Sequence, residues 1–107
     1  MKFHRTGNIA LHVADLKAAV NFYRDILNLP VKEFSDDEIL FEMESGLFYV
    51  TENPEWQGLV EEYEVADLDT ARSVLEAAGC NVVRWEGRGG DCYMQDPFGM
   101  FFNLWEV

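Results

Sequence analysis

The tetrapeptide Val-Ala-Asp-Leu occurs twice in the chain, at residues 13–16 and again 52 positions later at residues 65–68. In each copy, a run typical of a β-strand precedes the tetrapeptide and a run with helical periodicity follows it. Asp15 and Asp67 are suited to be helix N-caps, because a carboxylate accepts hydrogen bonds from the unpaired N–H groups of the first helical turn. Each copy therefore marks a strand that turns into a helix, which indicates that one module occurs twice.

The residues around the tetrapeptide repeat at the same offset. Ala19 corresponds to Ala71 and Val31 to Val83, and further apolar positions agree in character. We predict a single domain made of a first module at residues 8–53 and a second module at residues 59–107. Residues 1–7 are expected to form an arm, and residues 53–58 a connector rich in turn formers.

Each module reads as a strand, a helix and three further strands. Strands are predicted at residues 8–13, 31–34, 39–43 and 47–52, and again at residues 59–65, 81–85, 91–95 and 100–107. The first helix should run from Asp15 to about Asn28, and the second from Asp67 to a stop at Gly79. Their apolar stripes would be Leu16, Ala19, Val20, Tyr23, Ile26 and Leu27 in the first helix, and Leu68, Ala71, Val74, Leu75 and Ala78 in the second.

One helix can cover only one face of its module's sheet, so the other face needs a cover or a ligand. We therefore expect an α+β fold in which two βαβββ modules form a curved eight-stranded mixed sheet. The helices would lie on the convex side, and the concave face would line a cup between the modules.

The composition restricts the class of partner. Eight basic and 20 acidic residues give a net charge of −12, which opposes binding to nucleic acid or an anionic membrane and favours cationic ligands. An acidic surface can also serve solubility alone. No signal peptide or membrane-spanning run is evident, so we expect a cytoplasmic protein. Cys80 and Cys92 have no metal-site spacing and are expected to be packed, reduced thiols.

Two segments carry a family resemblance: HVADLKAAVNFYRDILNLPV at residues 12–31 and YMQDPFGMFFNLWEV at residues 93–107. They resemble the opening and closing signatures of the vicinal oxygen chelate superfamily, which includes glyoxalase I, bleomycin resistance proteins and extradiol dioxygenases. The resemblance implies the glyoxalase/bleomycin resistance fold of paired βαβββ modules. It also implies a homodimer with a cupped site between the modules.

In metal-dependent members of that superfamily, four side chains on the concave face hold a divalent metal. The resemblance places these four positions at Asn8, Tyr49, Val60 and Asn103, where the family has His, Glu, His and Glu. Valine has no ligand atom, and amide oxygens are poor ligands for transition metals. We therefore expect no metal site at these positions, no cofactor and no metal-dependent chemistry there.

Other polar residues are expected on the concave face. His12 shares the face of Asn8, and Glu62 and Glu64 should face the cup from the second module. They could form a displaced metal site or tune a base, or His12 could simply be bonded to a carboxylate with no catalytic task. Glu42 and Glu44 either line the cup as well or lie in solvent.

Aromatic residues alternate along the last strand. Phe101, Asn103 and Trp105 should point into the cup together with Tyr49, while Phe102 and Leu104 should pack under the helices. The alternative is that these aromatics belong only to the core or to a dimer contact. The loop at residues 87–90 carries Arg88, and it is either a plain hairpin turn or a segment that closes over a ligand.

The leading hypothesis is a dimeric, metal-independent binding protein, similar to the bleomycin resistance proteins of antibiotic resistance. It would hold a small aromatic or cationic compound without breaking bonds. The candidate ligand-binding residues are Asn8, His12, Tyr49, Glu62, Glu64, Phe101, Asn103 and Trp105. Two alternatives stay open: a lyase, isomerase or dioxygenase with a displaced metal site, and a non-catalytic structural subunit.

Overall fold

The computed structural model describes all 107 residues, which form two compact units. The first unit consists of Gly7–Leu59, and the second consists of Met1–Thr6 together with Val60–Val107. Strand β1 (His4–Val13) begins in the second unit and continues into the first at Gly7. The predicted N-terminal arm is therefore wrong for residues 4–7, because these residues already belong to the strand.

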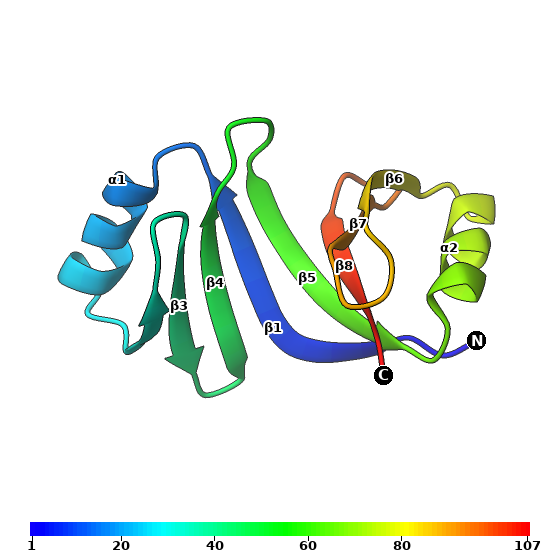
Figure 1. The fold of residues 1–107 in the computed structure, drawn as a ribbon, viewed down its shortest axis with the longest axis horizontal. Coiled ribbons are helices and arrows are strands. Elements are labelled where there is room, and N and C mark those ends of the chain that lie inside the picture. Colours follow the sequence, from blue (N-terminus) through cyan, green and yellow to red (C-terminus); the bar gives the residue numbers. More distant parts are fainter. The chain divides into compact units, whose positions relative to one another are not determined.

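The first unit continues with α1 (Leu16–Val20), the π-helical turn η1 (Asn21–Ile26), β2 (Val31–Phe34), β3 (Glu38–Met43) and β4 (Gly46–Glu52) (Figure 1). Its strand order is β2-β3-β4-β1, with β1 and β4 parallel and the other pairs antiparallel. The helical segment covers one face of this sheet. The core beneath it is built from Leu16, Val20, Ile39, Phe41, Phe48 and Val50.

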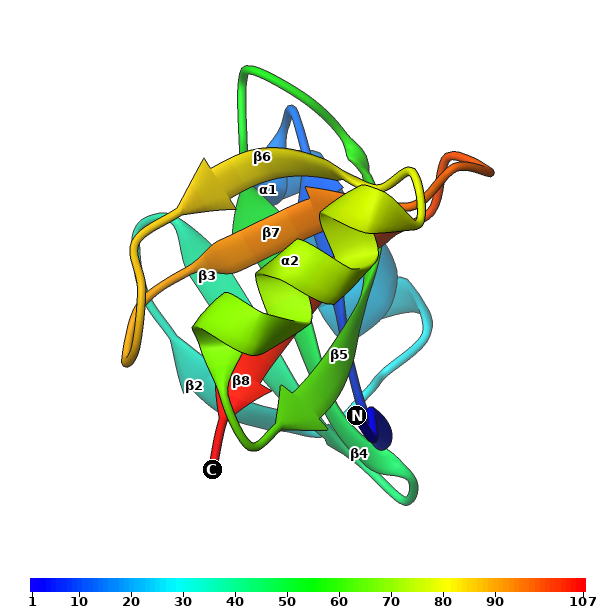
Figure 2. The same cartoon turned by 90° about the vertical axis from the view of Figure 1, so that its right-hand side faces the viewer.

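The second unit contains β5 (Gly58–Val65), α2 (Leu68–Ala77), β6 (Asn81–Trp85), β7 (Cys92–Gln95) and β8 (Phe101–Glu106). Its strand order is β5-β8-β7-β6, with β5 and β8 parallel and the other pairs antiparallel. Figure 2 shows α2 lying across this sheet. The core under α2 is built from Val65, Leu68, Ala71, Cys80, Cys92, Met94, Phe102 and Leu104.

Both helices begin at the repeated aspartate. The Asp15 carboxylate accepts from the backbone N–H of Ala18 at 3.1 Å, and the Asp67 carboxylate accepts from that of Thr70 at 3.0 Å. This confirms the two predicted N-caps and explains why strand turns into helix at each copy of the tetrapeptide.

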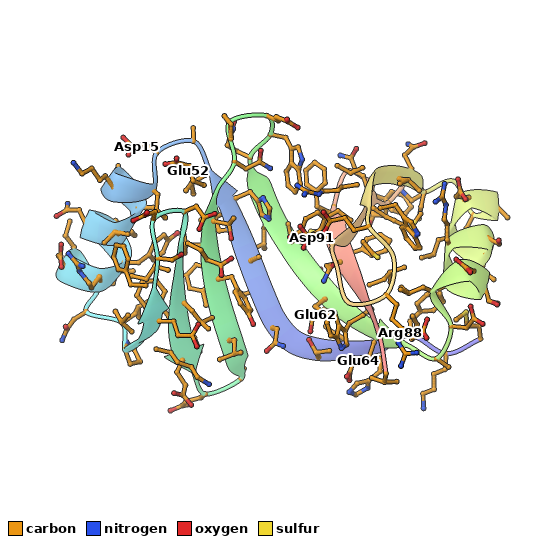
Figure 3. All side chains as sticks on the ribbon, viewed as in Figure 1. Asp15, Glu52, Glu62, Glu64, Arg88 and Asp91 are labelled. Atoms are coloured by element: carbon orange, nitrogen blue, oxygen red, sulfur yellow. The ribbon has the colours of Figure 1, made fainter.

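A glutamate at the end of a strand completes each helix start. Glu52 on β4 accepts from the backbone N–H of Leu16 at 3.2 Å, and Glu106 on β8 accepts from that of Leu68 at 3.1 Å. Figure 3 shows Asp15 and Glu52 together at the start of α1. Sequence reasoning missed these glutamates, because they lie 36 and 38 residues from the N–H groups that they accept from.

The register of the two parallel strand pairs repeats with the sequence. Ala10 on β1 lies opposite Tyr49 on β4, and 52 residues after Ala10, Glu62 on β5 lies opposite Asn103 on β8. Tyr49 and Asn103 are therefore equivalent positions of the two modules. The fold class is confirmed: an eight-stranded mixed sheet with four strands in each of two βαβββ modules, and in each module a helix that covers one face of that module's strands.

The helices differ from the prediction at their ends. Asn28 adopts the predicted left-handed conformation with φ 56°, and Gly79 ends α2 with φ 100°. However, the α-helical hydrogen bonds of the first helix stop at Val20, and a π-helical turn follows. Ile26, Leu27 and Val74 are 63%, 49% and 45% exposed, so the predicted apolar stripes were too wide. No helix of the chain is long and apolar enough to cross a membrane.

Candidate functional site

The helix-free face of the second unit carries a row of polar and aromatic side chains. Because Tyr63, Phe102, Leu104 and Met94 pack toward α2, the residues that alternate with them project from the opposite face. Across this face, Glu62 on β5 is paired with Asn103 on β8, and Asn103 with Tyr93 on β7. Two residues further along the same strands, Glu64 is paired with Trp105.

The two glutamates of this row have different surroundings. Both are partly buried, and Figure 3 shows them on β5. Glu62 accepts a hydrogen bond from the Thr6 hydroxyl at 2.9 Å, so the N-terminal part of β1 orients its carboxylate. Glu64 lies beside Trp105, whose side chain is 42% exposed. A carboxylate next to an exposed indole suits an aromatic cation, which can stack on the ring and pair with the charge.

Asparagines occupy two of the four positions that the resemblance assigns to metal ligands, and both accept a hydrogen bond from the backbone. The Asn8 side-chain oxygen accepts from the backbone N–H of Leu47 at 2.9 Å. The Asn103 side-chain oxygen accepts from that of Cys92 at 3.0 Å. In each unit, an amide thus holds the end of a neighbouring strand. These two oxygens accept backbone hydrogen bonds from neighbouring strands, and binding a metal would compete with those bonds.

The other two positions, Tyr49 and Val60, complete the comparison with a metal site. Val60 is 2% exposed and has no ligand atom. Tyr49 carries a phenol where a carboxylate would be needed. The four residues together offer neither imidazole, thiolate nor carboxylate, so they do not fit a divalent transition metal. Within either unit, no three His, Cys, Asp or Glu side chains come close enough to hold a metal ion.

His12 on β1 is held by the connector that follows β4. Its ring is 4% exposed and stacks on Trp56, with 4.4 Å between ring centroids and 13° between the planes. The side-chain nitrogen of Asn53 lies 3.1 Å from His12 Nδ1. Sequence reasoning treated this connector only as a turn. The available signal was Asn53 before Pro54, which is typical of a side-chain-stabilised turn.

The Asn53 contacts determine the tautomer of His12, that is, which ring nitrogen carries the proton. The Asn53 side-chain oxygen accepts from the backbone N–H groups of Glu55 and Trp56 at 2.9 Å and 3.3 Å, which fixes the orientation of the amide. The amide nitrogen therefore faces His12 Nδ1, and since it can only donate, Nδ1 must accept. The proton of neutral His12 then lies on Nε2. A metal on Nε2 would shift that proton to Nδ1, against the amide donor, which argues against the displaced metal site.

Three glutamates on β3 and directly after it differ in their surroundings. Glu38, on the same face as His12, accepts from the Thr51 hydroxyl at 2.8 Å, and Thr51 is paired with His12 across β4 and β1. Glu42 and Glu44 are exposed.

Arg88, in the loop between β6 and β7, forms an ion pair with Glu106, the glutamate on β8 that accepts from the first N–H group of α2. Its guanidinium lies 3.7 Å from the Glu106 carboxylate, and its side chain is 75% exposed. Figure 3 shows Arg88 in this loop and Asp91 where the chain returns toward β7. The Glu86 carboxylate accepts from the backbone N–H of Asp91, which fixes the base of the loop. This hydrogen bond, and after it the one from Arg84, lowers the pKa of the Glu86 carboxyl below its ordinary value.

Both cysteines are free and buried. Desolvation is the main reason that the pKa of each thiol is raised above its ordinary value. The prediction that both thiols are packed is confirmed, and the raised pKa values keep the thiolate fraction low.

Comparison with known proteins adds one family and several similar structures. No curated protein matches the chain. Homoprotocatechuate 2,3-dioxygenase from B. fuscum is similar in fold, with a TM-score of 0.67 and 23% identity over 98% of this chain and 33% of that one. A protein of Legionella pneumophila described as an NAD-dependent benzaldehyde dehydrogenase has a TM-score of 0.67 and 13% identity, over 94% of this chain and 98% of that one.

These likenesses in structure concern the fold alone, and the chain spans about a third of the length of the dioxygenase. The sequence itself is matched by the family model of the glyoxalase-like domain over residues 8–105, which covers both modules. That match includes the repeated tetrapeptides, the helix starts and the closing strand. The chain therefore belongs to the glyoxalase-like domain family.

Proposed function

We propose that this protein binds a small aromatic or cationic compound on the helix-free face of its sheet, without a metal and without breaking bonds. The observation that carries the proposal is the use of Asn8 and Asn103 as strand-holding amides at two family metal positions. With Val60 at a third position, the chemistry that remains is recognition by charge, stacking and hydrogen bonding.

The second unit supplies the charge and the stacking surface. Glu62 and Glu64 provide two negative charges, and Phe101 and Trp105 provide aromatic surface on the neighbouring strand. The net charge of −12 raises the local concentration of cations and acts in the same direction. On the helix-free face of the first unit, Asn8, His12 and Tyr49 stay predicted ligand-binding residues, with His12 covered by Trp56.

The proposal includes a homodimer in the cytoplasm. All four residues of edge strand β2 are exposed, among them Val31 at 43% and Phe34 at 52%. An edge strand has unpaired backbone N–H and C=O groups, which can pair with the same strand of a second copy. Light scattering of the purified chain would report the dimer, and a monomer at all concentrations would contradict it.

The binding test uses berberine, a flat aromatic cation whose fluorescence reports binding. Protein purified without a metal-affinity tag and dialysed is first checked for metal by elemental mass spectrometry. Metal-free protein should bind berberine, and adding Zn²⁺, Ni²⁺, Mn²⁺ or Fe²⁺ should not increase the affinity. Stoichiometric metal in the purified protein, or berberine binding only after metal addition, would contradict the proposal.

The location of the site is tested with the double variant Glu62→Gln and Glu64→Gln. It should weaken berberine binding about tenfold, because each exposed charge pair contributes up to about 1 kcal/mol and 1.4 kcal/mol corresponds to a factor of ten. The matched control is Glu33→Gln with Asp69→Asn, which removes the same charge from β2 and α2 and should change the affinity far less. Equal losses in both double variants would mean that only the net charge matters.

A further inference from the structure

A cavity lies on the helix side of the second unit, away from the site proposed above. Its volume is about 310 Å³. Its wall is mainly apolar and aromatic, and includes Phe3, Tyr63, Leu75, Cys80, Met100 and Phe102. Cavities that hold small organic ligands begin at about 300 Å³ and have this kind of wall with a few polar groups. The cavity therefore has room for a ligand with one aromatic ring.

The cavity and the helix-free face are on opposite sides of the same strands. Tyr63 alternates with Glu62 and Glu64 along β5, and Phe102 alternates with Asn103 along β8. Tyr63 and Phe102 are packed edge to face with 5.8 Å between ring centroids, in the core beside α2. A ligand in the cavity would therefore contact none of Glu62, Glu64, Asn103 and Trp105.

Two carboxylates complete the wall, and they differ in their partners. Glu61 forms an ion pair with Arg5, whose guanidinium also lies 5.8 Å from the centroid of the Tyr63 ring. Asp96 has no basic side chain paired with it, and its Oδ1 accepts only from the backbone N–H groups of Phe98 and Met100, at 2.8 Å and 3.0 Å. The negative charge of Asp96 is therefore the one on this wall that lacks a counter-charge.

The chain holds Asp96 in place from two directions. The turn that follows it is closed by the bond from Gly99 N–H to the Asp96 carbonyl at 3.2 Å. Behind it, Gly79 at the end of α2 has φ 100°, and a Cβ there would lie 3.3 Å from Pro97 Cγ. The close approach of Gly79 and Pro97 brings the turn against the end of α2, next to Cys80. Desolvation and then the charge of Asp96 raise the pKa of the Cys80 thiol, which agrees with this proximity.

We propose that this cavity is a second binding site, which takes a single-ring aromatic amine in its protonated form. The ring packs against Phe3, Tyr63 and Phe102, and the ammonium group pairs with the Asp96 carboxylate. Charge selects the cation, because Asp96 lacks a counter-charge while Glu61 is already neutralised by Arg5. The volume selects one ring rather than a fused, flat system such as berberine.

The test compares benzylamine, benzyl alcohol and benzoate, which share a ring and differ in charge. Protein labelled with ¹³C at the methionine methyl groups is titrated and followed by NMR, and Met100→Leu identifies the Met100 signal. We expect a saturable shift of the Met100 methyl signal with benzylamine, about fivefold weaker binding of benzyl alcohol and none of benzoate. The Met43 signal, from the first unit, should not move. No saturable shift of Met100, or equal affinity for all three compounds, would overturn the proposal.

Two variants locate the charge and the ring. Asp96→Asn keeps an oxygen for the N–H groups of Phe98 and Met100, so the turn should survive. Asp96→Asn should reduce benzylamine affinity to that of benzyl alcohol. Asp69→Asn, which removes a charge from an exposed position of α2, should leave the affinity unchanged. Leu75→Phe should fill the cavity and abolish binding of both compounds, in protein shown by thermal unfolding to be folded. Unchanged benzylamine affinity in Asp96→Asn would overturn the assignment.

One more variant distinguishes the two proposed sites by experiment. The double variant Glu62→Gln and Glu64→Gln, which should weaken berberine binding, should leave the benzylamine shift of Met100 unchanged. A parallel loss of both ligands would mean that one site binds both, and would overturn the second site.

Discussion

The two units begin their helices with the same capping hydrogen bonds, but the helices that follow differ in geometry. In both, an aspartate accepts from the third residue after it, and a glutamate from a distant strand accepts from the first residue of the helix. After this start, α2 remains α-helical to Ala77, while α1 gives way to a π-helical turn after Val20. The shared start shows what a cap encodes: where a helix begins, and not how it continues.

The divergence follows the packing of each helix. In the first unit, the Leu27 N–H bonds to the Phe22 carbonyl at 2.9 Å, and Phe22, Ile26 and Leu27 are all largely exposed. In the second unit, the stop at Gly79 returns the chain to β6, and the end of α2 packs against Pro97. A π-helical turn is uncommon and often marks a functional segment. Here it carries the exposed Phe22 and Ile26, and its Arg24 guanidinium lies 5.6 Å from the centroid of the Phe34 ring on edge strand β2.

The helix-free faces also differ. The first unit presents Asn8, His12, Tyr49 and Thr51, of which His12 is locked by Asn53 and Trp56. The second unit presents Glu62 and Glu64 beside Phe101 and Trp105. The two faces thus differ in their carboxylates: Glu38 of the first unit accepts from the Thr51 hydroxyl, whereas Glu64 of the second unit lies beside the exposed Trp105. Duplication preserved the register of the strands while the side chains on them diverged.

The largest effect in this comparison is expected for glycines with the same backbone angle. Gly7 and Gly87 both have φ 85°, but a Cβ at Gly7 would lie 2.3 Å from the Ser45 carbonyl oxygen, while at Gly87 nothing lies within 4 Å. Gly7→Ala should lower the free energy of unfolding by about 3 kcal/mol or more, since it adds a backbone clash to the strain of the left-handed conformation. Gly87→Ala should cost only about 1 kcal/mol.

Urea denaturation of the two glycine variants measures the difference directly. Equal losses would show that the approach of Gly7 to Ser45 does not constrain the first unit. Gly89, with φ 84° and an equally empty surrounding, offers a second control for the strain alone.

A smaller effect is expected from the glutamates that complete the helix starts. Glu106→Ala should lower the free energy of unfolding by about 1 kcal/mol, because it removes a charged acceptor from the N–H of Leu68 and the partner of Arg88. Glu52→Ala should cost less, because Glu52 is exposed and water can replace it. Thermal unfolding of the two variants gives the order. A larger loss for Glu52→Ala would reverse the comparison.

The smallest effect concerns two exposed carboxylates whose pKa values are lowered. Arg24 lowers the pKa of Asp25 by hydrogen bonding and by charge, whereas Glu86 is held first by the Asp91 N–H and then by Arg84. A lowered pKa means that each carboxylate stabilises the fold at pH above its ordinary pKa, and that this contribution is lost as the pH falls through the lowered value.

Carboxyl ¹³C titrations should separate the two causes. Arg24→Ala should return the pKa of Asp25 to its ordinary value, while Arg84→Ala should raise that of Glu86 only in part, because the Asp91 N–H remains. Full return of Glu86 in Arg84→Ala would show that the backbone bond has no effect on its own.

Much of the fold could be predicted because its signals are local. The bounds of β2 and β6 agree with the prediction, and Asp15, Asp67, Asn28 and Gly79 act as predicted within a turn of their own position. The strand at residues 4–7 was predicted to be an arm, because its pairing depends on distant residues. The π-helical turn was missed because its sequence has the periodicity of an α-helix.

The candidate site was less predictable. The resemblance assigned four positions to metal ligands, and the residue types at those positions can be read without coordinates. The roles of those residues did need them: the Leu47 N–H lies 39 residues from Asn8, and the Cys92 N–H lies 11 residues from Asn103. The ring orientation and protonation of His12 depend in the same way on Asn53, 41 residues away.

The sequence by itself determined the duplicated module, the start of each helix and the chemical character of the family metal positions. Caps, turns and side-chain alternation act over a few residues, so a linear chain encodes them directly. Only the tertiary structure decided which carboxylates are paired, which amides hold strands and where a cavity opens beside α2. Those properties depend on strand register and on packing between residues far apart in the chain, and a shift of one residue would exchange the two faces of each strand.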